Sequence, residues 1–357
     1  MPFFAALSHS LLLLLAPVSL GLDSVAPPPN PWLWFPVVTG APETGFGGGL
    51  VLGWFEGGGV GSRPSSAVGS AMITSKGHRI LSIFPELYLF DGRFDVAGEL
   101  QAQKYPDLFY GVGGATTGAM EEAFTSRSVT AELAIRVEAR PGLRVGGLLL
   151  ARHDRLVETE EGALLSSGSV SGSDGGTTIG VGLIAVVDTR DNLYAPRAGV
   201  LWESKVATFA PALGSDYGFR QATMDLRHYL AIGGGAVLGT RAYGASSWGD
   251  PPFYAMPQIG AQGLLRGYRE GRFRDRAAAA AEFELRIPLT GRFGAVLFGG
   301  VGGVAPDLSG LPGPADLERT VGAGFRFRLN DGGVNLRVDY GVGREGGGLY
   351  LGIGEAF

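Results

Sequence analysis

Strict alternation of apolar and polar residues over ten or more positions is the feature that most limits the fold of this chain. In residues 320–329, Val, Ala, Phe and Leu take every second position, with Thr, Gly and Arg between them. Residues 334–343 and 281–289 repeat the pattern. Successive side chains of a β-strand point to opposite faces of the sheet, so a period of two predicts strands with one apolar and one polar face.

The length of these segments favours strands that cross a membrane. A tilted transmembrane strand needs about ten residues, whereas strands of soluble proteins average about five or six. The polar faces carry both signs of charge, as the wet interior of a barrel does. Because a sheet in lipid must leave no backbone edge unpaired, we predict an all-β fold: one antiparallel transmembrane β-barrel over residues 32–357. Its sixteen predicted strands are 32–40, 44–55, 65–75, 78–90, 93–104, 123–138, 142–155, 174–188, 198–209, 215–231, 234–247, 277–288, 292–303, 317–328, 332–342 and 346–357.

The connections between these strands alternate in length. Short turns on one side and long loops on the other are typical of outer-membrane barrels, and they place both ends of the barrel on the short-turn, periplasmic side. The stretch 56–64 departs from this rule, being long where a short turn is expected. The predicted short turns are Asp91-Gly92, Pro141-Gly142, Gly233-Gly234, Thr290-Gly291 and Asp331-Gly332, and the long loops are 105–122, 156–173, 248–276 and 304–316.

The N-terminus carries the longest apolar run, centred on residues 11–15 and followed by the small residues Ser19 and Gly21. This pattern predicts a secretory signal peptide over 1–21, although no Lys or Arg precedes the run; a short anchor helix is the alternative. Residues 22–31 then form a short Pro-rich periplasmic segment. The absence of Cys excludes disulfides, Cys-zinc sites and thiol catalysis. A net charge of −5 argues against a nucleic-acid partner.

Leu265-Arg266-Gly267-Tyr268 lies in the long break 248–276, just before the last five predicted strands. An Arg between an apolar residue and a Gly, in a loop flanked by barrel strands, suggests an extracellular loop that folds back into the barrel. The tetrapeptide resembles the [VL]-R-G-[FY] signature of the BamA/TamA outer-membrane superfamily, also called the bacterial surface antigen family, and it stands where that family carries it.

Three further segments are similar to features of this family. Pro42-Glu43-Thr44-Gly45, followed by three consecutive Gly, resembles its first hairpin. The turn between strands eight and nine resembles a D-x-R-[DN]…P-x-x-G motif, and the last residues resemble a barrel-assembly signal that ends in an aromatic. The turn motif comprises Asp188, Arg190, Asp191, Pro196 and Gly199, and the C-terminal signal comprises Leu351, Ile353 and Phe357.

The resemblance implies that Arg266 reaches into the lumen and pairs with a carboxylate on the barrel wall. The family's usual partner is the Asp of an F-x-D-x-G pattern on strand thirteen, but here Gly300 stands at that position. An isolated charge in a confined lumen is costly, so another carboxylate is expected to substitute. The alternation points three candidates inward: Glu282, Glu284 and Asp339.

The resemblance also implies a place in the bacterial outer membrane and a role in protein insertion or translocation. Expected partners are outer-membrane lipid, the barrel-assembly machinery, and client outer-membrane proteins. About ten residues separate the predicted signal peptide from the first strand, so no POTRA domain is expected there, and a separate POTRA-bearing protein is a further candidate partner. We also predict a weak seam, the contact between the first and last strands that closes the barrel. Pro36 lies on the first strand and cannot donate to a ladder, and Gly352 and Gly354 on the last strand weaken one.

Two other functions stay open at this level. A passive outer-membrane pore needs nothing beyond the barrel. An outer-membrane hydrolase needs a catalytic set, and His153-Asp154 is the only adjacent His and carboxylate pair. No metal-ligand spacing appears, so we expect no metal, no cofactor and no enzymatic activity.

Overall fold

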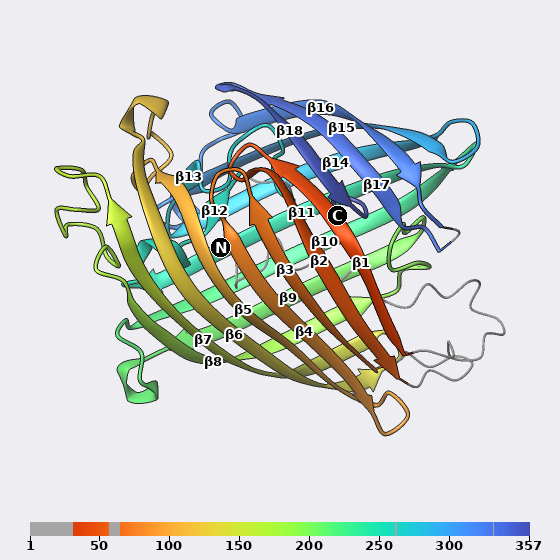
Figure 1. The fold of residues 1–357 in the computed structure, drawn as a ribbon, viewed down its shortest axis with the longest axis horizontal. Helices are drawn as coiled ribbons and strands as arrows, with labels where there is room; N and C mark the ends of the chain where they lie inside the picture. The colour runs from red at the N-terminus through yellow and green to blue at the C-terminus, as the bar shows by residue number, and fades with distance from the viewer. Residues whose placement is uncertain (1–30, 57–64, 261–262, 331) are drawn as a thin grey trace.

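The computed structural model describes residues 31–56, 65–260, 263–330 and 332–357, and it shows a closed antiparallel β-barrel. Strands follow one another around the wall in chain order, and β1 (Trp32–Ala41) lies beside β18 (Gly346–Ile353) (Figure 1). The sixteen-stranded all-β barrel predicted from the alternation is therefore confirmed. The predicted signal peptide 1–21, the segment 22–30 and the long connection 57–64 lie outside the described residues.

The strand bounds follow the predicted segments closely. The other barrel strands are β2 (Gly45–Glu56), β3 (Ser65–Thr74), β4 (Arg79–Leu89), β5 (Phe94–Phe109), β6 (Glu122–Arg140), β7 (Leu143–Thr159), β8 (Gly176–Asp188), β9 (Gly199–Phe209), β10 (Phe219–Gly233), β11 (Ala236–Gly249), β14 (Ala277–Pro288), β15 (Phe293–Ala305), β16 (Glu318–Arg328) and β17 (Asn335–Gly343). The loops add a two-stranded sheet, β12 (Gln258–Ile259) with β13 (Phe273–Arg274), and the short 3-10 helices η2 (Gly118–Met120), η3 (Pro211–Leu213), η4 (Phe253–Ala255) and η5 (Leu308–Gly310).

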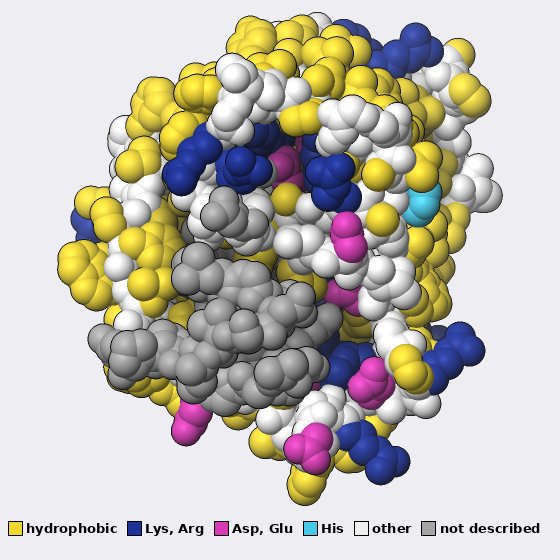
Figure 2. Space-filling view, turned by 90° about the vertical axis from the view of Figure 1, so that its right-hand side faces the viewer, with side chains coloured by type: hydrophobic (Ala, Val, Ile, Leu, Met, Phe, Trp, Pro, Cys, Tyr) yellow, Lys and Arg dark blue, Asp and Glu magenta, His cyan; other side chains and the backbone are white. Residues whose placement is uncertain are grey.

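The alternation sorts side chains between the outside and the inside of the barrel. Apolar side chains such as Trp34, Leu183 and Val321 are about two-thirds exposed (67%, 65% and 65%) because they point outward. Figure 2, which looks at the end of the barrel on the right of Figure 1, shows hydrophobic side chains around the periphery and charged ones in the mouth. Within the described residues, no helix is long and apolar enough to span a membrane.

The structure corrects several predicted strand ends. The last strand ends at Ile353 rather than at 357, because Gly354 adopts a φ of 85° and turns the chain inward, where Phe357 packs near Tyr229. Strand β5 continues to Phe109 instead of stopping at 104, because residues 105–109 still pair with β6. Strand β7 likewise continues to Thr159 instead of stopping at 155, and β10 begins at Phe219 instead of at 215. The long loop also contains the β12–β13 hairpin.

The connection between β11 and β14, residues 250–276, folds back into the barrel. Its apolar side chains pack on the inner wall formed by β11, β14 and β15. The buried set includes Ile259, Leu264, Leu265, Tyr268 and Phe273 from the loop and Tyr243, Ala278, Ala280 and Val304 from the wall. This apolar packing, together with the polar contacts described below, fixes the loop inside the lumen.

The ladder between β1 and β18 is the weakest around the barrel. It contains a single register pair, Gly40 with Leu351. The neighbouring ladders contain ten pairs between β1 and β2 and eight between β17 and β18. One side-chain bond, from Thr39 Oγ1 to the Leu351 carbonyl oxygen (3.3 Å), adds to this contact.

Candidate functional site

The tip of the long loop, Leu265 to Tyr268, is buried against the inner wall of β14 to β18. Leu265 has a φ of 56° and Gly267 a φ of 122°. A Cβ on Gly267 would lie 2.8 Å from the main-chain carbon of Val342, so only Gly lets the loop backbone approach β17 this closely. The Gly of the tetrapeptide is therefore required by both conformation and space.

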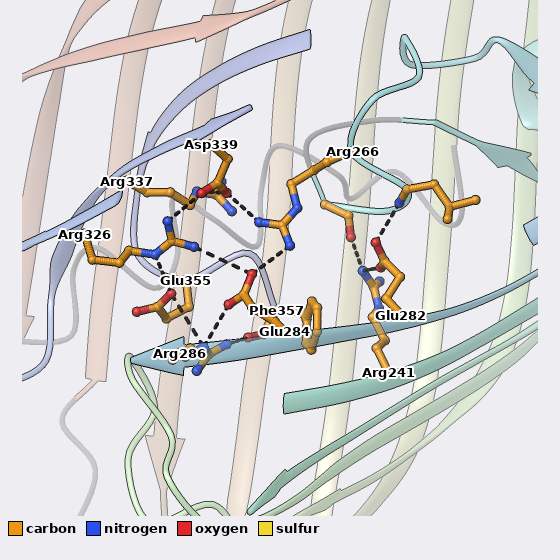
Figure 3. A network of polar contacts seen from close by, with 12 residues as sticks. Arg241, Arg266, Glu282, Glu284, Arg286, Arg326, Arg337, Asp339, Glu355 and Phe357 are labelled. Carbon is orange, nitrogen blue, oxygen red and sulfur yellow. Dashed lines mark hydrogen bonds and ion pairs between the residues drawn. The ribbon is translucent and has the colours of Figure 1, made fainter. Parts of the chain in front are cut away.

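The Arg266 guanidinium is 1% exposed and contacts two carboxylates from different strands. Its Nη2 donates to Glu284 Oε2 (2.7 Å) on β14, and its Nη1 donates to Asp339 Oδ2 (2.5 Å) on β17. The same group lies over the Phe298 ring of β15, 3.6 Å from its centroid. Of the three candidate partners named from sequence, Glu284 and Asp339 lie within hydrogen-bond distance of Arg266 (Figure 3).

Glu282 has a different position. Its Oε1 accepts a hydrogen bond from the Leu265 backbone N–H (2.8 Å), and its Oε2 lies 3.7 Å from Arg241 Nη1. Arg241 in turn donates to the carbonyl oxygen of Gly263. Glu282 and Arg241 therefore contact the loop backbone rather than the Arg266 side chain.

Gly300 lies directly beneath Leu265. A Cβ at position 300 would stand 2.9 Å from Leu265 Cδ2, and one at Gly302 would stand 2.5 Å from Leu265 Cδ1. The two Gly therefore form a hollow that the Leu265 side chain fills. An Asp at position 300 would occupy the same space, which explains on steric grounds why the carboxylates for Arg266 come from β14 and β17 instead.

Arg266 belongs to a larger set of buried charges, here called the lumenal charge cluster. Four arginines share three carboxylates, and Glu284 and Asp339 each have three arginine partners. At Asp339, Arg326 Nη1 contacts Oδ1 (2.5 Å), and Arg337 Nε lies 3.8 Å from Oδ2. Arg337 is fully buried, and none of its guanidinium nitrogens has a hydrogen-bond partner among the described residues. The cluster comprises Arg266, Glu284, Arg286, Arg326, Arg337, Asp339 and Glu355 (Figure 3).

Tyr268 joins the loop to the last three strands. Its hydroxyl donates to Glu318 Oε2 (2.6 Å) and accepts from the Arg344 backbone N–H (3.0 Å). Burial, and then the hydrogen bond to Glu318, raise the pKa of Tyr268 to about 12, so it stays a neutral donor. Tyr350 on β18 donates its hydroxyl to the Tyr268 carbonyl oxygen (3.1 Å) and accepts from the Gly267 backbone N–H (2.9 Å).

A second polar group connects the loop to the first strands at the long-loop end of the barrel. Tyr105 on β5 donates to Glu270 Oε2 (3.2 Å), and Arg269 Nη2 contacts Asp107 (3.3 Å). Burial, and then the nearby Glu270 carboxyl, raise the pKa of Glu43 in the β1–β2 turn to about 8. Burial likewise raises the pKa of Glu270. Two buried carboxyl groups therefore face each other between the first hairpin and the loop.

The residues of the predicted turn motif order the connection between β8 and β9. Asp188 holds Arg190 through two bonds, with Nε to Oδ1 at 2.9 Å and Nη2 to Oδ2 at 3.0 Å. Asp191 Oδ1 accepts the backbone N–H groups of residues 197 (2.8 Å) and 198 (3.1 Å). Gly199 has a φ of 102°. The Pro196 carbonyl oxygen accepts from Arg286 Nη1 (3.4 Å), which links this turn to the lumenal charge cluster.

The predicted C-terminal signal is divided between two places. Leu351 and Ile353 are on β18, whereas Phe357 lies past its end, inside the barrel, where a main-chain oxygen accepts from Arg286 Nη2 (2.6 Å). Glu355, next to it, bonds Arg326 Nε (2.7 Å). The inward turn of the last residues therefore adds a carboxylate to the lumenal charge cluster.

The candidate hydrolase pair is separated by the pleat of β7. His153 points outward and is exposed, while Asp154 points inward, is buried and is held by Arg152. Adjacent residues of a strand face opposite sides, so these two side chains cannot act together. Among the described residues, no three His, Asp or Glu side chains gather where they could hold a metal ion.

Sequence reasoning missed the arginines that share the carboxylates with Arg266. The signal was present, because the alternation puts Arg286, Arg326 and Arg337 on inward faces beside the three candidate carboxylates. What the pattern lacked was the register between strands, which sets which charges meet. Tyr350 and Glu355 were also missed, and no local pattern marks their contacts with the loop and the cluster.

Comparisons with known proteins agree with this geometry. Residues 83–357 match the family model described as the Omp85 superfamily domain. Solved structures with a similar fold include BamA from Haemophilus ducreyi lacking POTRA domains 1–3, with 15% identity, a TM-score of 0.63, and coverage of 91% of this chain and 70% of that one. CdiB from Escherichia coli has 14% identity, a TM-score of 0.61, and coverage of 92% and 64%.

CdiB from Acinetobacter baumannii is also similar, with 14% identity, a TM-score of 0.58, and coverage of 90% of this chain and 59% of that one. The chain thus spans 59% to 70% of the length of these three solved structures. No individually curated protein matches the sequence at a significant level.

Proposed function

Because the chain belongs to the Omp85 superfamily, we propose that it is an outer-membrane barrel that assembles or translocates other proteins by opening between β1 and β18. Its clients are unfolded outer-membrane or exported polypeptides, and its surroundings are outer-membrane lipid. In this proposal residues 1–21 are the signal peptide, 22–31 are a short periplasmic segment, and 32–357 are the working barrel. A POTRA-bearing protein supplied separately and the barrel-assembly machinery are its proposed partners.

The observation that carries this proposal is the single register pair between β1 and β18. Opening an ordinary ladder of eight or ten pairs breaks many backbone hydrogen bonds, each worth about 0.5–1.5 kcal/mol net. Opening this one breaks very few. Unpaired strand edges template the addition of another strand, so a partly open seam offers an incoming polypeptide a place to pair.

The loop contacts support an asymmetric opening. The tip of the loop is bonded to β14, β16, β17 and β18 through Glu284, Glu318, Asp339 and Tyr350. No bond from the tip residues 265–268 to β1 is present in the described part of the chain. The loop therefore binds the C-terminal side of the seam, and in this proposal β1 is the strand that moves.

The outer surface supports placement in a membrane. Exposed apolar side chains cover the outward face of the strands, and exposed tryptophans lie near both ends of the barrel. Trp32 and Trp34 lie at one end and Trp248 at the other, as expected of aromatic girdles at the two interfaces.

A disulfide across the seam tests the proposal. A Cβ at Gly40 would lie 3.5 Å from the Leu351 Cβ, a suitable separation for a disulfide, and the chain has no Cys of its own. In liposomes, the reduced Gly40→Cys/Leu351→Cys protein should accelerate folding of an unfolded eight-stranded outer-membrane barrel, and the oxidised protein should not.

The matched control joins Ala97 and Ala134, register partners on β5 and β6, and should keep activity in both redox states. Full activity of the oxidised seam variant would contradict seam opening. If the unmodified protein fails to accelerate folding but conducts ions steadily in a planar bilayer, the passive-pore alternative replaces the proposal.

A further inference from the structure

Four cations form a row on the outward face of the barrel, near its long-loop end. Arg79, Lys104, Arg127 and Arg155 belong to strands β4, β5, β6 and β7, and each is the register partner of the next. Neighbouring strands are about 4.8 Å apart, so the row spans about 14 Å. The three arginines are exposed, and the strand alternation points all four side chains away from the lumen.

Little within the protein neutralises this row. Lys104 Nζ lies 3.3 Å from Glu158 Oε1, an exposed pair. The guanidinium groups of Arg79, Arg127 and Arg155 make no hydrogen bond or ion pair with any described residue. Like charges placed directly opposite each other on paired strands are destabilising, so the arrangement calls for anions supplied from outside the chain.

An apolar groove adjoins the row, and the four cations line one side of it. It has a volume of about 1070 Å³ and runs along the outer wall of β2 to β7. The next outward row down the strands reads Leu50, Ala71, Leu81, Ala102, Val129 and His153. The small side chains of Ala71 and Ala102 leave the wall hollow between larger neighbours, with room for an acyl chain.

The two features together fit one kind of ligand. We propose that this face binds an acylated lipid whose headgroup carries more than one phosphate, with its phosphates on the basic row and an acyl chain in the groove. Guanidinium groups bind phosphate through paired N–H donors. A row of about 14 Å is longer than one phosphate needs, which favours a bisphosphorylated headgroup. The inference rests on the proposed membrane placement but not on the proposed insertion activity.

Lipid retention measured on the purified protein tests this site. The folded barrel in detergent is titrated with bisphosphorylated lipid A, and bound lipid is counted by native mass spectrometry. Replacing Arg79, Arg127 and Arg155 with Gln should weaken retention by on the order of tenfold or more, since each basic residue contributes to anionic lipid binding. The same lipid without its phosphates should bind the unmodified protein about as weakly as bisphosphorylated lipid A binds the triple Gln variant.

The matched control uses exposed arginines at the opposite ends of two of the same strands. Arg93 precedes β5 and Arg140 ends β6, and their replacement with Gln should leave retention unchanged. A separate variant, Ala71→Leu/Ala102→Leu, fills the groove and should weaken binding of the acylated lipid while leaving the basic row intact. Heat-modifiable gel migration confirms that each variant is folded.

Three results would overturn the proposal. Equal losses in the Arg93/Arg140 control would show general charge attraction instead of a site. Equal retention of the phosphate-free lipid would show that the row binds no phosphate. Retention of single-phosphate phosphatidylglycerol as strong as that of lipid A would remove the inference of a bisphosphorylated headgroup. None of these measurements depends on client folding, so a failure here is distinct from a failure of the insertion proposal.

Discussion

Replacing Arg266 with Met should release the loop tip from the wall at a cost that the contacts define. Two charge-assisted hydrogen bonds are lost, to Glu284 and to Asp339, each worth about 1.5–3 kcal/mol. Neither carboxylate is left bare, because Glu284 keeps Arg286 (2.8 Å) and Asp339 keeps Arg326 (2.5 Å). We therefore expect a loss of about 3–4 kcal/mol in unfolding free energy, at the low end of the range for a broken buried pair.

Urea unfolding in detergent micelles, followed by tryptophan fluorescence, measures this loss. Cleavage within the loop by a protease added outside proteoliposomes gives an independent readout of loop release. The control is Arg276→Met, since Arg276 is in the same loop but is exposed. If Arg266→Met lowers the unfolding free energy no more than Arg276→Met does, and the loop still resists the protease, the charge contacts do not hold the loop and the reasoning is refuted.

Three other substitutions follow from the same structure. Asp339→Asn should destabilise the barrel more than Arg266→Met in the same urea assay, because three arginines share that carboxylate; a smaller effect would contradict the sharing. Gly302→Ala should cost about 1–3 kcal/mol by clashing with Leu265, and a second change, Leu265→Ala, should recover part of it; no recovery would place the clash elsewhere. Glu43 has a raised pKa, so it favours the folded state at low pH, and this stability is lost as pH rises from about 4.5 to about 8. Glu43→Gln should therefore flatten the pH dependence of the unfolding free energy and raise stability at pH 8 to 9. An unchanged pH profile would contradict this role of Glu43.

Alternation predicted the strands because it is a local property of the chain. In 281–289 and 334–343, each residue's face follows from its parity alone, so Glu284 and Asp339 were assigned to the lumen without knowledge of any neighbour. The loop 248–276 was also visible locally, as a break in the pattern. Segments with a clear period of two were placed to within a few residues for this reason.

The errors arose where a distant contact overrode the local pattern. Residues 354–357 were predicted to extend the last strand, yet they leave it because Phe357 packs near Tyr229 and Glu355 bonds Arg326. The β12–β13 hairpin forms because the loop is enclosed by the barrel wall. Neither contact leaves a periodic signal in the sequence.

The sequence by itself therefore determined the barrel, its number of strands, the faces of its side chains and the loop that enters it. The tertiary structure alone decided which carboxylates bind Arg266, that the Leu265 side chain packs in the space above Gly300, and that β1 and β18 share a single register pair. The physical reason is that the face of a side chain depends on its position within one strand, whereas a contact between charges depends on the register of the ladders from β14 to β17. A shift of one residue in one of these ladders would change the partners of the charges on the strands that it joins.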